Sequence, residues 1–461
     1  MLRLVYGILQ NFILLSLQAK LIVLKTNLRL GLAVKDYVNI GLEMSSTLDH
    51  EDTASLYRVR KTLIREAVLK DLEGDTPSAQ DKFKAVEDLS SVALKLAPGH
   101  QKIFGFIGSE ITSSIGHTAL CLSLRQMANE LSGNTLRFYI TADSQANPHY
   151  LSYWEKYFPK LGIDSNLSPV IEREMWPFFE NVSSLNFRGK SYSLYEAHNS
   201  IIREWEQSGK GPLLVLSDED KLHGNRFLAS RSQSFKEGGQ FVALHVRSSN
   251  HFALGLMNGS SYGRNAHIQS YLKSIRFLID SGYTVVRIGE PHAEDLPAIA
   301  GLYDYANDPL REPRLDTYFL AECEFLLGTN SGPICVPPTF GKRVIMTNAP
   351  SLGRTSYFPN SLMVPKLVAD SDGQVLTFKE MLVDGSAWSD GWPVSKSNNR
   401  LFWRDNDEDE ILNAVKELII SDHILPSRLR EQFEVLISSY GSPATANISE
   451  SFLSKWQQLL S

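Results

Sequence analysis

The chain has 461 residues, which is too long for one hydrophobic core, so we expect several structural units. Hydrophobic residues make up 43% of the sequence and charged residues 21%, close to the average for folded soluble proteins. The formal net charge of −6 leaves no basic excess to neutralise a nucleic-acid backbone, so nucleic acid is not an expected partner. The three cysteines lack a CxxC spacing and fit buried thiols in a reducing cytoplasm.

Residues 1–98 have apolar positions three and four apart and almost no strand signal, which predicts an α-helical N-terminal extension. From Leu4 to Ala19 this extension contains no charge, and its apolar content continues to Leu24. The uncharged run is shorter than a membrane span needs. We therefore expect a buried or interfacial helix, with a peripheral contact to the inner membrane through residues 1–24 of a cytoplasmic protein.

From residue 99 the pattern changes to short apolar runs that alternate with helical stretches, which is typical of parallel strands joined by crossover helices. The pattern occurs in two successive blocks, residues 99–235 and 236–368, and predicts an α/β protein with two doubly wound, Rossmann-like domains. In the first block the expected strands are Ile103–Ile107, Leu136–Ile140 and Leu213–Leu216. In the second they are Phe241–Val246, Thr284–Ile288, Glu324–Leu327 and Arg343–Met346.

Residues 369–461 read as a loop-rich stretch followed by helices that pack back on the domains. The acidic stretch Asp405–Asp409 is typical of a helix start, because carboxylates cap and stabilise the N-terminal turn. We expect this helix to continue through Glu417.

Ligands of doubly wound sheets bind beyond the carboxyl ends of the strands. His245 and Arg247 follow the first apolar run of the second block, and strand alternation places both on one face, toward the crevice. An arginine here could hold a diphosphate through two parallel hydrogen bonds. The alternative is an arginine paired with an acidic neighbour, beside a buried histidine with satisfied hydrogen bonds.

A second polar stretch, Gly328–Pro333, follows the expected strand Glu324–Leu327 and leads into a helical turn that can begin at Pro333. Small residues, hydroxyls and backbone N–H groups at such a turn suit an anionic phosphate. The alternative is an ordinary capping turn. The candidate ligands in this stretch are Thr329, Asn330, Ser331 and Gly332.

Two further cations belong to the same expected edge. Arg264 and Asn265 come just before a helix expected over Ile268–Asp280, which could bring Arg264 over the crevice. Arg287 lies inside or at the end of the expected strand Thr284–Ile288 and could bind a phosphate or serve as a structural ion-pair partner.

His117 lies in the first block, where a loop after the strand Ile103–Ile107 meets the start of a helix. A neutral imidazole near the positive end of a helix can accept a proton, so His117 is a candidate general base or phosphate contact. The alternative is a capping histidine without chemistry.

Metal and hydrolase chemistry find little support in the sequence. It has no HExxH or His/Cys cluster, and its close aspartate pairs fall in expected turns or helix starts. It also has no GxSxG elbow. We therefore expect no metal site and no cofactor beyond a donor substrate.

Taken together, these stretches resemble a family of bacterial glycosyltransferases found among surface-polysaccharide genes. The resemblance covers roughly Gly105 to Leu460 and leaves out the N-terminal helices. Five motifs carry it in the family's order: His245-Val-Arg247, Tyr262-Gly-Arg-Asn265, Gly282-Tyr-Thr-Val-Val-Arg-Ile-Gly289, Asp304-Tyr-Ala-Asn307 and Gly328-Thr-Asn-Ser-Gly332.

More distantly, the His-x-Arg motif is similar to that of fucosyltransferases, and Gly328–Pro333 resembles a turn of heptosyltransferases. Both groups have the two-domain fold called GT-B. The resemblance implies that Arg247 contacts the donor diphosphate and that the Asn330–Gly332 turn approaches the nucleotide or its phosphates. Asn330 stands where heptosyltransferases usually have Asp, and Ile334-Cys335 where a Met-His pair is common, so heptose specificity does not carry over.

The sequence thus leads to the hypothesis of a metal-independent glycosyltransferase. It would move a sugar from a nucleotide diphosphate sugar to a glycan or lipid-linked glycan acceptor of surface-polysaccharide synthesis. Arg247 would offset charge on the leaving diphosphate, and His117 would act as the base. The alternatives are a nucleotide-sugar epimerase on the same fold and a non-catalytic scaffold that binds a nucleotide.

Overall fold

The computed structural model describes residues 103–107, 109–133, 137–140, 145–158, 184–188, 190–232, 235, 239–248, 263–290, 296–352, 356–388, 393, 401–440 and 447–461. The helical extension expected over residues 1–98, with its membrane contact, lies outside these residues and stays a prediction. The chain divides into two compact units, which we describe separately. The first comprises residues 1–109, 133–143 and 158–182, and the second comprises the rest.

In the first unit the described strands are β1 (Ile103–Ile107) and β2 (Arg137–Ile140), which pair in parallel with Ile107 opposite Ile140. Both of these isoleucines are buried. The two strands match two of the apolar runs of the first block. A complete doubly wound domain over residues 99–235 stays a prediction, as do the proposed domain boundaries.

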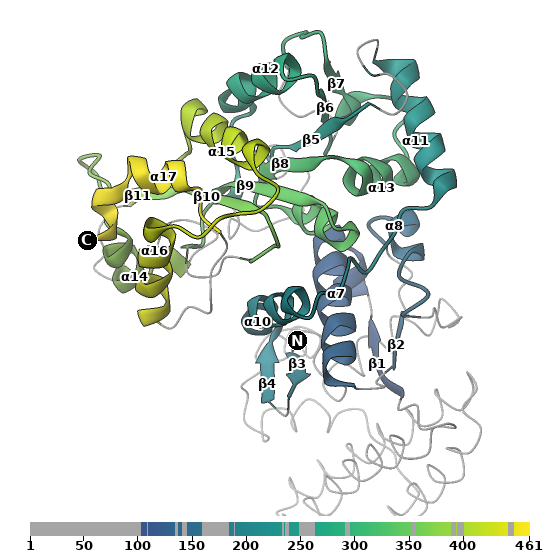
Figure 1. Cartoon of the computed structure of the whole chain (residues 1–461), viewed down its shortest axis with the longest axis horizontal. Coiled ribbons are helices and arrows are strands. Elements are labelled where there is room, and N and C mark those ends of the chain that lie inside the picture. Colours follow the sequence, from purple (N-terminus) through teal and green to yellow (C-terminus); the bar gives the residue numbers. More distant parts are fainter. Residues whose placement is uncertain are drawn as a thin grey trace, which may run out of the picture. The chain divides into compact units, whose positions relative to one another are not determined.

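The second unit is built on a six-stranded parallel sheet, whose strand order is β10-β9-β8-β5-β6-β7 (Figure 1). Its strands are β5 (Phe241–His245), β6 (Thr284–Arg287), β7 (Leu302–Asp304), β8 (Phe325–Thr329), β9 (Arg343–Ala349) and β10 (Leu362–Pro365). The chain starts in the middle at β5, winds to one edge and then returns to build the other. This is the doubly wound order predicted for the second block, and its switch point lies between β5 and β8.

The central strands are buried along their whole length because both faces of the sheet are covered. Every residue of β5, β6 and β8 is buried. Continuous apolar runs of this kind are expected for parallel strands covered by helices on both faces. Gly328 lets β8 approach β5 closely, since a Cβ atom there would lie 2.4 Å from the carbonyl oxygen of His245.

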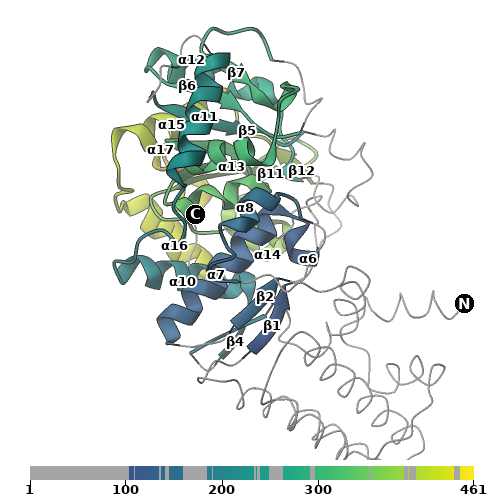
Figure 2. The same ribbon diagram turned by 90° about the vertical axis from the view of Figure 1, so that its right-hand side faces the viewer.

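Helices cover the two faces of the sheet (Figures 1 and 2). On one face α12 (Leu272–Asp280), which continues the 3-10 turn η5 (Ile268–Tyr271), packs against α15 (Glu408–Ile420). On the other face α13 (Pro313–Glu322) packs against α11 (Asp218–Arg231). The expected helices over Ile268–Asp280 and after the acidic stretch are therefore confirmed. Asp407 caps α15 and forms a reciprocal capping box with Glu410.

The other described helices and strands of this unit form two further groups. The long helix α7 packs against α10, and α10 in turn packs on the antiparallel pair β3–β4. Their bounds are α6 (Ser109–Thr112), α7 (Ile115–Ser132), α8 (Pro148–Ser152), β3 (Ser184–Phe187), β4 (Lys190–Ser193) and α10 (Leu194–Gln207). The C-terminal part adds β11 (Leu367–Ala369), α14 (Phe378–Asp384), β12 (Phe402–Arg404), α16 (Arg428–Ser439) and α17 (Glu450–Lys455).

The strand expected at Leu213–Leu216 is wrong. This segment is irregular and leads directly into α11. The backbone N–H of Leu214 donates to the carbonyl of Thr339 at 2.9 Å, and the carbonyl of Leu213 accepts from Lys156 and Tyr157. Leu213 and Leu214 are buried in the core. The apolar run at Leu213–Leu216 therefore reflects burial and does not indicate a strand.

Candidate functional site

Three parts of the predicted site, His245, Arg247 and the stretch Thr329–Gly332, meet at the carboxyl ends of β5 and β8, on the two sides of the switch point. His245 is the last residue of β5 and pairs with Gly328 of β8. Thr329 ends β8, and the turn from Asn330 to Gly332 follows it. In a doubly wound sheet, a ligand binds in the crevice where the connections that follow two adjacent strands lead to opposite sides of the sheet.

His245 is buried and joins both of its neighbouring strands. Its Nε2 lies 3.0 Å from the hydroxyl oxygen of Ser331, beyond β8, and its Nδ1 lies 3.4 Å from the carbonyl oxygen of Ile288, beyond β6. Gly289 leaves room for the ring, because a Cβ atom there would lie 2.9 Å from Nδ1, and its φ of +128° also favours glycine. The imidazole is thus fixed in place and in contact with the predicted phosphate turn.

Arg247 ties three segments together through its backbone. Its N–H donates to the hydroxyl of Thr329 at 3.0 Å, and its carbonyl accepts from the N–H of Ala266 at 2.9 Å. The second bond anchors the segment that carries Arg264 and Asn265. The side chain of Arg247 is buried at this edge of the sheet.

Arg264 and Asn265 carry buried polar atoms that lack hydrogen-bond partners. Within the described part of the chain, Nε of Arg264 and both amide atoms of Asn265 are buried without one. Native proteins satisfy nearly all such atoms, since each unsatisfied one costs about 1–3 kcal/mol. The atoms orphaned here are two donors and one acceptor, a set that a polar, anionic ligand could complete.

Arg264 also lies close to the turn after β8, because its charge acts on Cys335 at the end of that turn. Burial raises the pKa of the Cys335 thiol to about 12, and the nearby positive charge of Arg264 opposes this rise. The positive charge of Arg264 is thus within electrostatic range of the turn.

The turn itself differs in one respect from the expectation. Pro333 does lie in the first turn of a helical segment, but this segment, η7 (Gly332–Cys335), is a 3-10 helix of four residues. Such a short helix has little dipole to attract an anion. Any anion binding here therefore depends on side chains and on the N–H groups of the turn.

Lys366 holds the Arg264–Asn265 segment through its backbone, and the sequence analysis did not predict this lysine as part of the site. Its ammonium donates to the carbonyl of Asn265 at 2.7 Å and pairs with Asp405 at 2.5 Å. Burial lowers the pKa of Lys366, and the charge of Asp405 opposes this effect. A single lysine inside the apolar stretch 362–368 was the signal that could have indicated a buried, paired charge.

The start of α7 packs directly against the turn. A Cβ atom on Gly116 would lie 2.5 Å from the Cα of Gly332, and one on Gly332 would lie 3.1 Å from the N of Gly116. Only glycine at position 116 permits this approach. His117 is the next residue and is exposed in the first turn of α7, so the candidate base belongs to the helix that contacts the turn.

Arg287 has a partner within the protein. Its Nη1 lies 3.3 Å from a carboxylate oxygen of Asp304, which also accepts from the amide of Asn307 at 2.9 Å. The arginine side chain is 4% exposed and the Asp304 side chain 32% exposed, so this is a half-buried pair at the ends of β6 and β7. The geometry fits the structural alternative for Arg287, while its phosphate-binding role stays a prediction.

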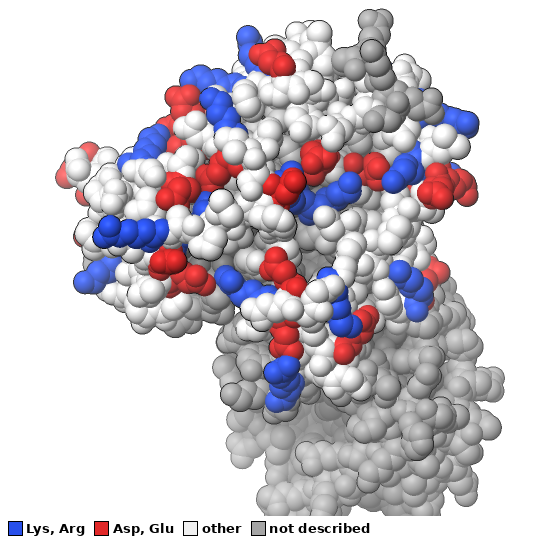
Figure 3. Space-filling model, in the orientation of Figure 1, with Lys and Arg blue, Asp and Glu red and all other residues white. Residues whose placement is uncertain are grey.

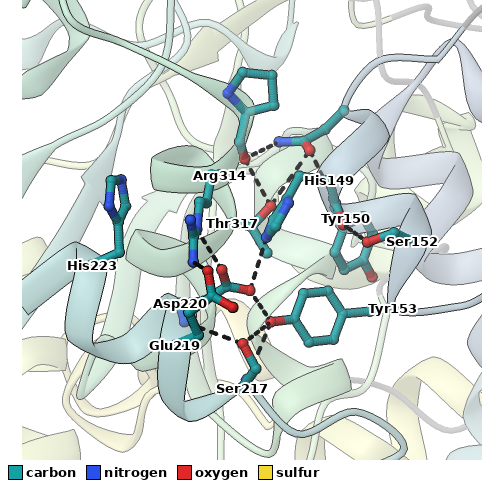
Figure 4. Close-up of polar contacts among 12 residues, drawn as sticks. His149, Tyr150, Ser152, Tyr153, Ser217, Glu219, Asp220, His223, Arg314 and Thr317 are labelled. Carbon is teal, nitrogen blue, oxygen red and sulfur yellow. Dashed lines mark hydrogen bonds and ion pairs between the residues drawn. The ribbon is translucent and has the colours of Figure 1, made fainter.

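A second polar cluster lies among α8, α11 and α13 and was not predicted. Figure 4 shows His149, Tyr153 and Arg314 converging on Asp220. The distances to its carboxylate are 2.9 Å from His149 and 2.5 Å from Arg314, and the Tyr153 hydroxyl also donates to it. Burial raises the pKa of Asp220, but the hydrogen bonds from Tyr153, His149 and Arg314 outweigh it and bring the pKa down to about 2. We call this group the Asp220 cluster.

The described residues contain no group of three or more histidine, cysteine, aspartate or glutamate side chains placed to hold a metal ion. None of their helices combines the length and the apolar character that crossing a membrane requires. Acidic and basic side chains are interspersed over the face shown in Figure 3.

The fold and the site together define an α/β protein with a cationic, incompletely satisfied edge at its switch point. No family model matches the chain, and no curated protein sequence matches it. The chain is similar to several solved structures. One is the family 9 glycosyl transferase from Veillonella parvula, with 13% identity, a TM-score of 0.40, and coverage of 69% of this chain and 97% of that one.

Another is the E. coli ADP-heptose lipopolysaccharide heptosyltransferase II, with 14% identity, a TM-score of 0.36, and coverage of 55% and 86%. A third is the E. coli heptosyltransferase WaaC with ADP-2-deoxy-2-fluoro heptose, with 12% identity, a TM-score of 0.29, and coverage of 57% and 92%. These proteins are glycosyltransferases by name. At such TM-scores the likeness carries no argument about chemistry, which depends here on the geometry of the site.

Proposed function

We propose that the chain is a glycosyltransferase that moves a sugar from a nucleotide diphosphate sugar to a glycan or lipid-linked glycan acceptor. One observation carries the proposal: the Nε of Arg264 is buried and has no hydrogen-bond partner among the described residues. A buried N–H donor without an acceptor is costly unless a ligand supplies one. The diphosphate of a nucleotide sugar supplies two negative charges to such a position.

The remaining residues fit a diphosphate at the same edge. Arg247 lies beyond β5 and is joined through its backbone to Thr329, while Ser331 and the N–H groups of the turn lie beyond β8. When a nucleotide sugar reacts, negative charge develops on the leaving diphosphate. Arg247, Arg264 and the turn would stabilise that charge, which is the basis for proposing transfer that does not depend on a metal.

His117 is the proposed base that activates the acceptor. It is exposed in the first turn of α7, one residue beyond the glycine that contacts Gly332. A proton acceptor there would be near a sugar whose diphosphate occupies the turn. His117→Gln should lower kcat and leave the Kd of the donor nearly unchanged. A changed Kd with a normal kcat would assign His117 to donor binding instead.

The experiment that tests the function is calorimetry of the full chain with ADP-, GDP- and UDP-sugars. We expect one class of nucleotide to bind, and Arg247→Ala to weaken that binding. Arg188→Ala is the matched control, because Arg188 is an arginine with 64% side-chain exposure outside this edge. Unchanged binding and transfer by Arg247→Ala would refute the central role of Arg247.

Two further outcomes distinguish other functions. If the donor incubated alone becomes an isomeric sugar nucleotide, shown by chromatography and mass spectrometry, the protein is an epimerase. If no nucleotide sugar binds, the chain is a scaffold without donor chemistry. Consumption of the donor only in the presence of an acceptor supports transfer.

A further inference from the structure

The hydrogen bonds of His245 determine which of its ring nitrogens carries a proton. Its Nδ1 lies 3.4 Å from the carbonyl oxygen of Ile288, and a carbonyl can only accept. Nδ1 is therefore the protonated nitrogen of the neutral ring. Its Nε2 then presents a lone pair to the hydroxyl of Ser331, 3.0 Å away, so this hydroxyl must donate to the ring.

This arrangement conflicts with the role of Ser331 in a phosphate site. A hydroxyl has one proton, and Ser331 uses it on His245. The hydroxyl oxygen can then offer only lone pairs to a ligand, whereas the oxygens of a diphosphate diester are acceptors and repel lone pairs. In this state Ser331 cannot donate a hydrogen bond to phosphate.

Protonation of His245 removes the conflict. In the imidazolium both nitrogens carry protons, so Nε2 donates to the oxygen of Ser331 while Nδ1 still donates to Ile288. The hydroxyl proton of Ser331 is then free to turn toward an anionic oxygen. The positive charge on the ring adds a favourable electrostatic interaction with the same anion.

We propose that His245 is a positioning residue that takes up a proton when the diphosphate of a nucleotide sugar binds, and thereby turns Ser331 into a hydrogen-bond donor to that diphosphate. The inference rests on the proposed function and adds a property to it: donor binding is coupled to proton uptake. Because the coupling is reciprocal, a lower pH strengthens binding and bound donor raises the pKa of His245.

The charged groups around this edge determine how strongly the coupling operates. Arg247 and Arg264 are cations that disfavour a further positive charge on His245 before the ligand binds. Glu290, after β6, is an exposed anion that favours a positive charge on His245. On α7, His117 is a titratable group near the turn. Arg287 and Asp304 are paired with each other and largely cancel. A bound diphosphate adds negative charge and shifts the balance toward the imidazolium.

The test is calorimetry of the full chain with the ADP-, GDP- or UDP-sugar that binds, because its diphosphate diester keeps the same charge from pH 6 to pH 8.5. Titrations at one pH in two buffers of different ionisation enthalpy count the protons taken up. For the natural chain we expect uptake approaching one proton per ligand, and binding about tenfold tighter at pH 6 than at pH 8.

Two variants separate positioning from a simple charge effect. His245→Gln places an amide N–H near the position of Nε2, so it donates to Ser331 at every pH; we expect binding without proton uptake and without pH dependence. Ser331→Ala removes the hydroxyl and leaves the ring; we expect weaker binding with proton uptake reduced to a small fraction. Circular dichroism confirms that each variant is folded.

The outcomes are distinguishable. Binding by the natural chain without proton uptake overturns the inference and leaves the glycosyltransferase proposal intact. Full proton uptake by Ser331→Ala overturns it too, since the imidazolium would then act on the anion directly. Uptake by His245→Gln equal to that of the natural chain would assign the proton to another group. Failure of all nucleotide sugars to bind removes the proposed function itself.

Discussion

The edge between β5 and β8 and the Asp220 cluster use similar residue types but differ in how completely their polar atoms are partnered. In the Asp220 cluster a single carboxylate accepts from His149, Tyr153 and Arg314. At the strand edge, the Nε of Arg264 has no partner within the described residues. The difference teaches that a charged residue whose donors are all held by its neighbours stabilises the architecture, whereas a buried donor atom without a partner can be offered to a ligand.

The strongest test of this contrast replaces one arginine from each region with glutamine. Arg264→Gln should weaken binding of the nucleotide sugar about 100-fold, since it removes charge-assisted hydrogen bonds to the diphosphate. The ligand-free protein should be equally stable or more stable, because the buried, unpartnered Nε is gone. Calorimetry gives the Kd, and urea unfolding gives the free energy of unfolding.

Arg314→Gln should show the opposite pattern, with lower stability and an unchanged Kd. Its Nε–Asp220 distance of 2.5 Å shows a close ion pair, although the arginine side chain is 28% exposed and therefore partly screened. Equal losses of binding in the two variants would break the proposed division between the regions.

The contact of α7 with the turn gives the next largest effect. Gly116→Ala places a methyl group 2.5 Å from the Cα of Gly332, which should cost about 1–3 kcal/mol of stability and also weaken donor binding by displacing the turn. Gly211→Ala is the matched control, because a Cβ atom there meets nothing within 4 Å. Equal stability of the two variants in urea unfolding would contradict the close packing of α7 on the turn.

The Asp220 cluster should make stability depend on pH in the acid range. The pKa of Asp220 is lowered in the folded protein to about 2 from an ordinary value of 3.8, so its ionised form stabilises the fold. This stabilisation, about 2 kcal/mol, is fully present above pH 4 and is lost as the pH falls toward 2. Asp220→Asn should flatten this part of the curve of unfolding free energy against pH.

Asp218→Asn is the control, since Asp218 is an exposed carboxylate in the first turn of the same helix. A natural chain whose stability is flat between pH 4 and pH 2 would argue against the network around Asp220. Donor binding at neutral pH should be the same for both variants.

The smallest effect is expected beside this cluster, at the pair of His223 and Glu312. Their side chains are 41% and 44% exposed, so solvent screens the 2.7 Å contact. His223→Gln should change the free energy of unfolding by about 0.5 kcal/mol or less. A loss as large as that of Asp220→Asn would show that contact geometry outweighs burial in this region.

Several elements were predictable because they depend on local pattern. Continuous apolar runs marked β5, β6, β8 and β9, and the acidic stretch before α15 marked its capped start. The short strands β7 and β10 were not predicted, because β7 has three residues that are only half-buried and the apolar run of β10 is interrupted by Pro365 and Lys366. At Leu213 burial alone produced an apolar run, and the run was misread as a strand.

The sequence by itself determined that polar residues follow the buried strands of a doubly wound sheet, and therefore which residues could meet a ligand. Strand alternation and the position of each run are local properties, so His245, Arg247 and the Asn330–Gly332 turn were found without coordinates. Only the tertiary structure decided which charges find partners. Pairing joins residues far apart in the chain: Lys366 holds the carbonyl of Asn265, Gly116 meets Gly332, and the Nε of Arg264 has no hydrogen-bond partner among the described residues.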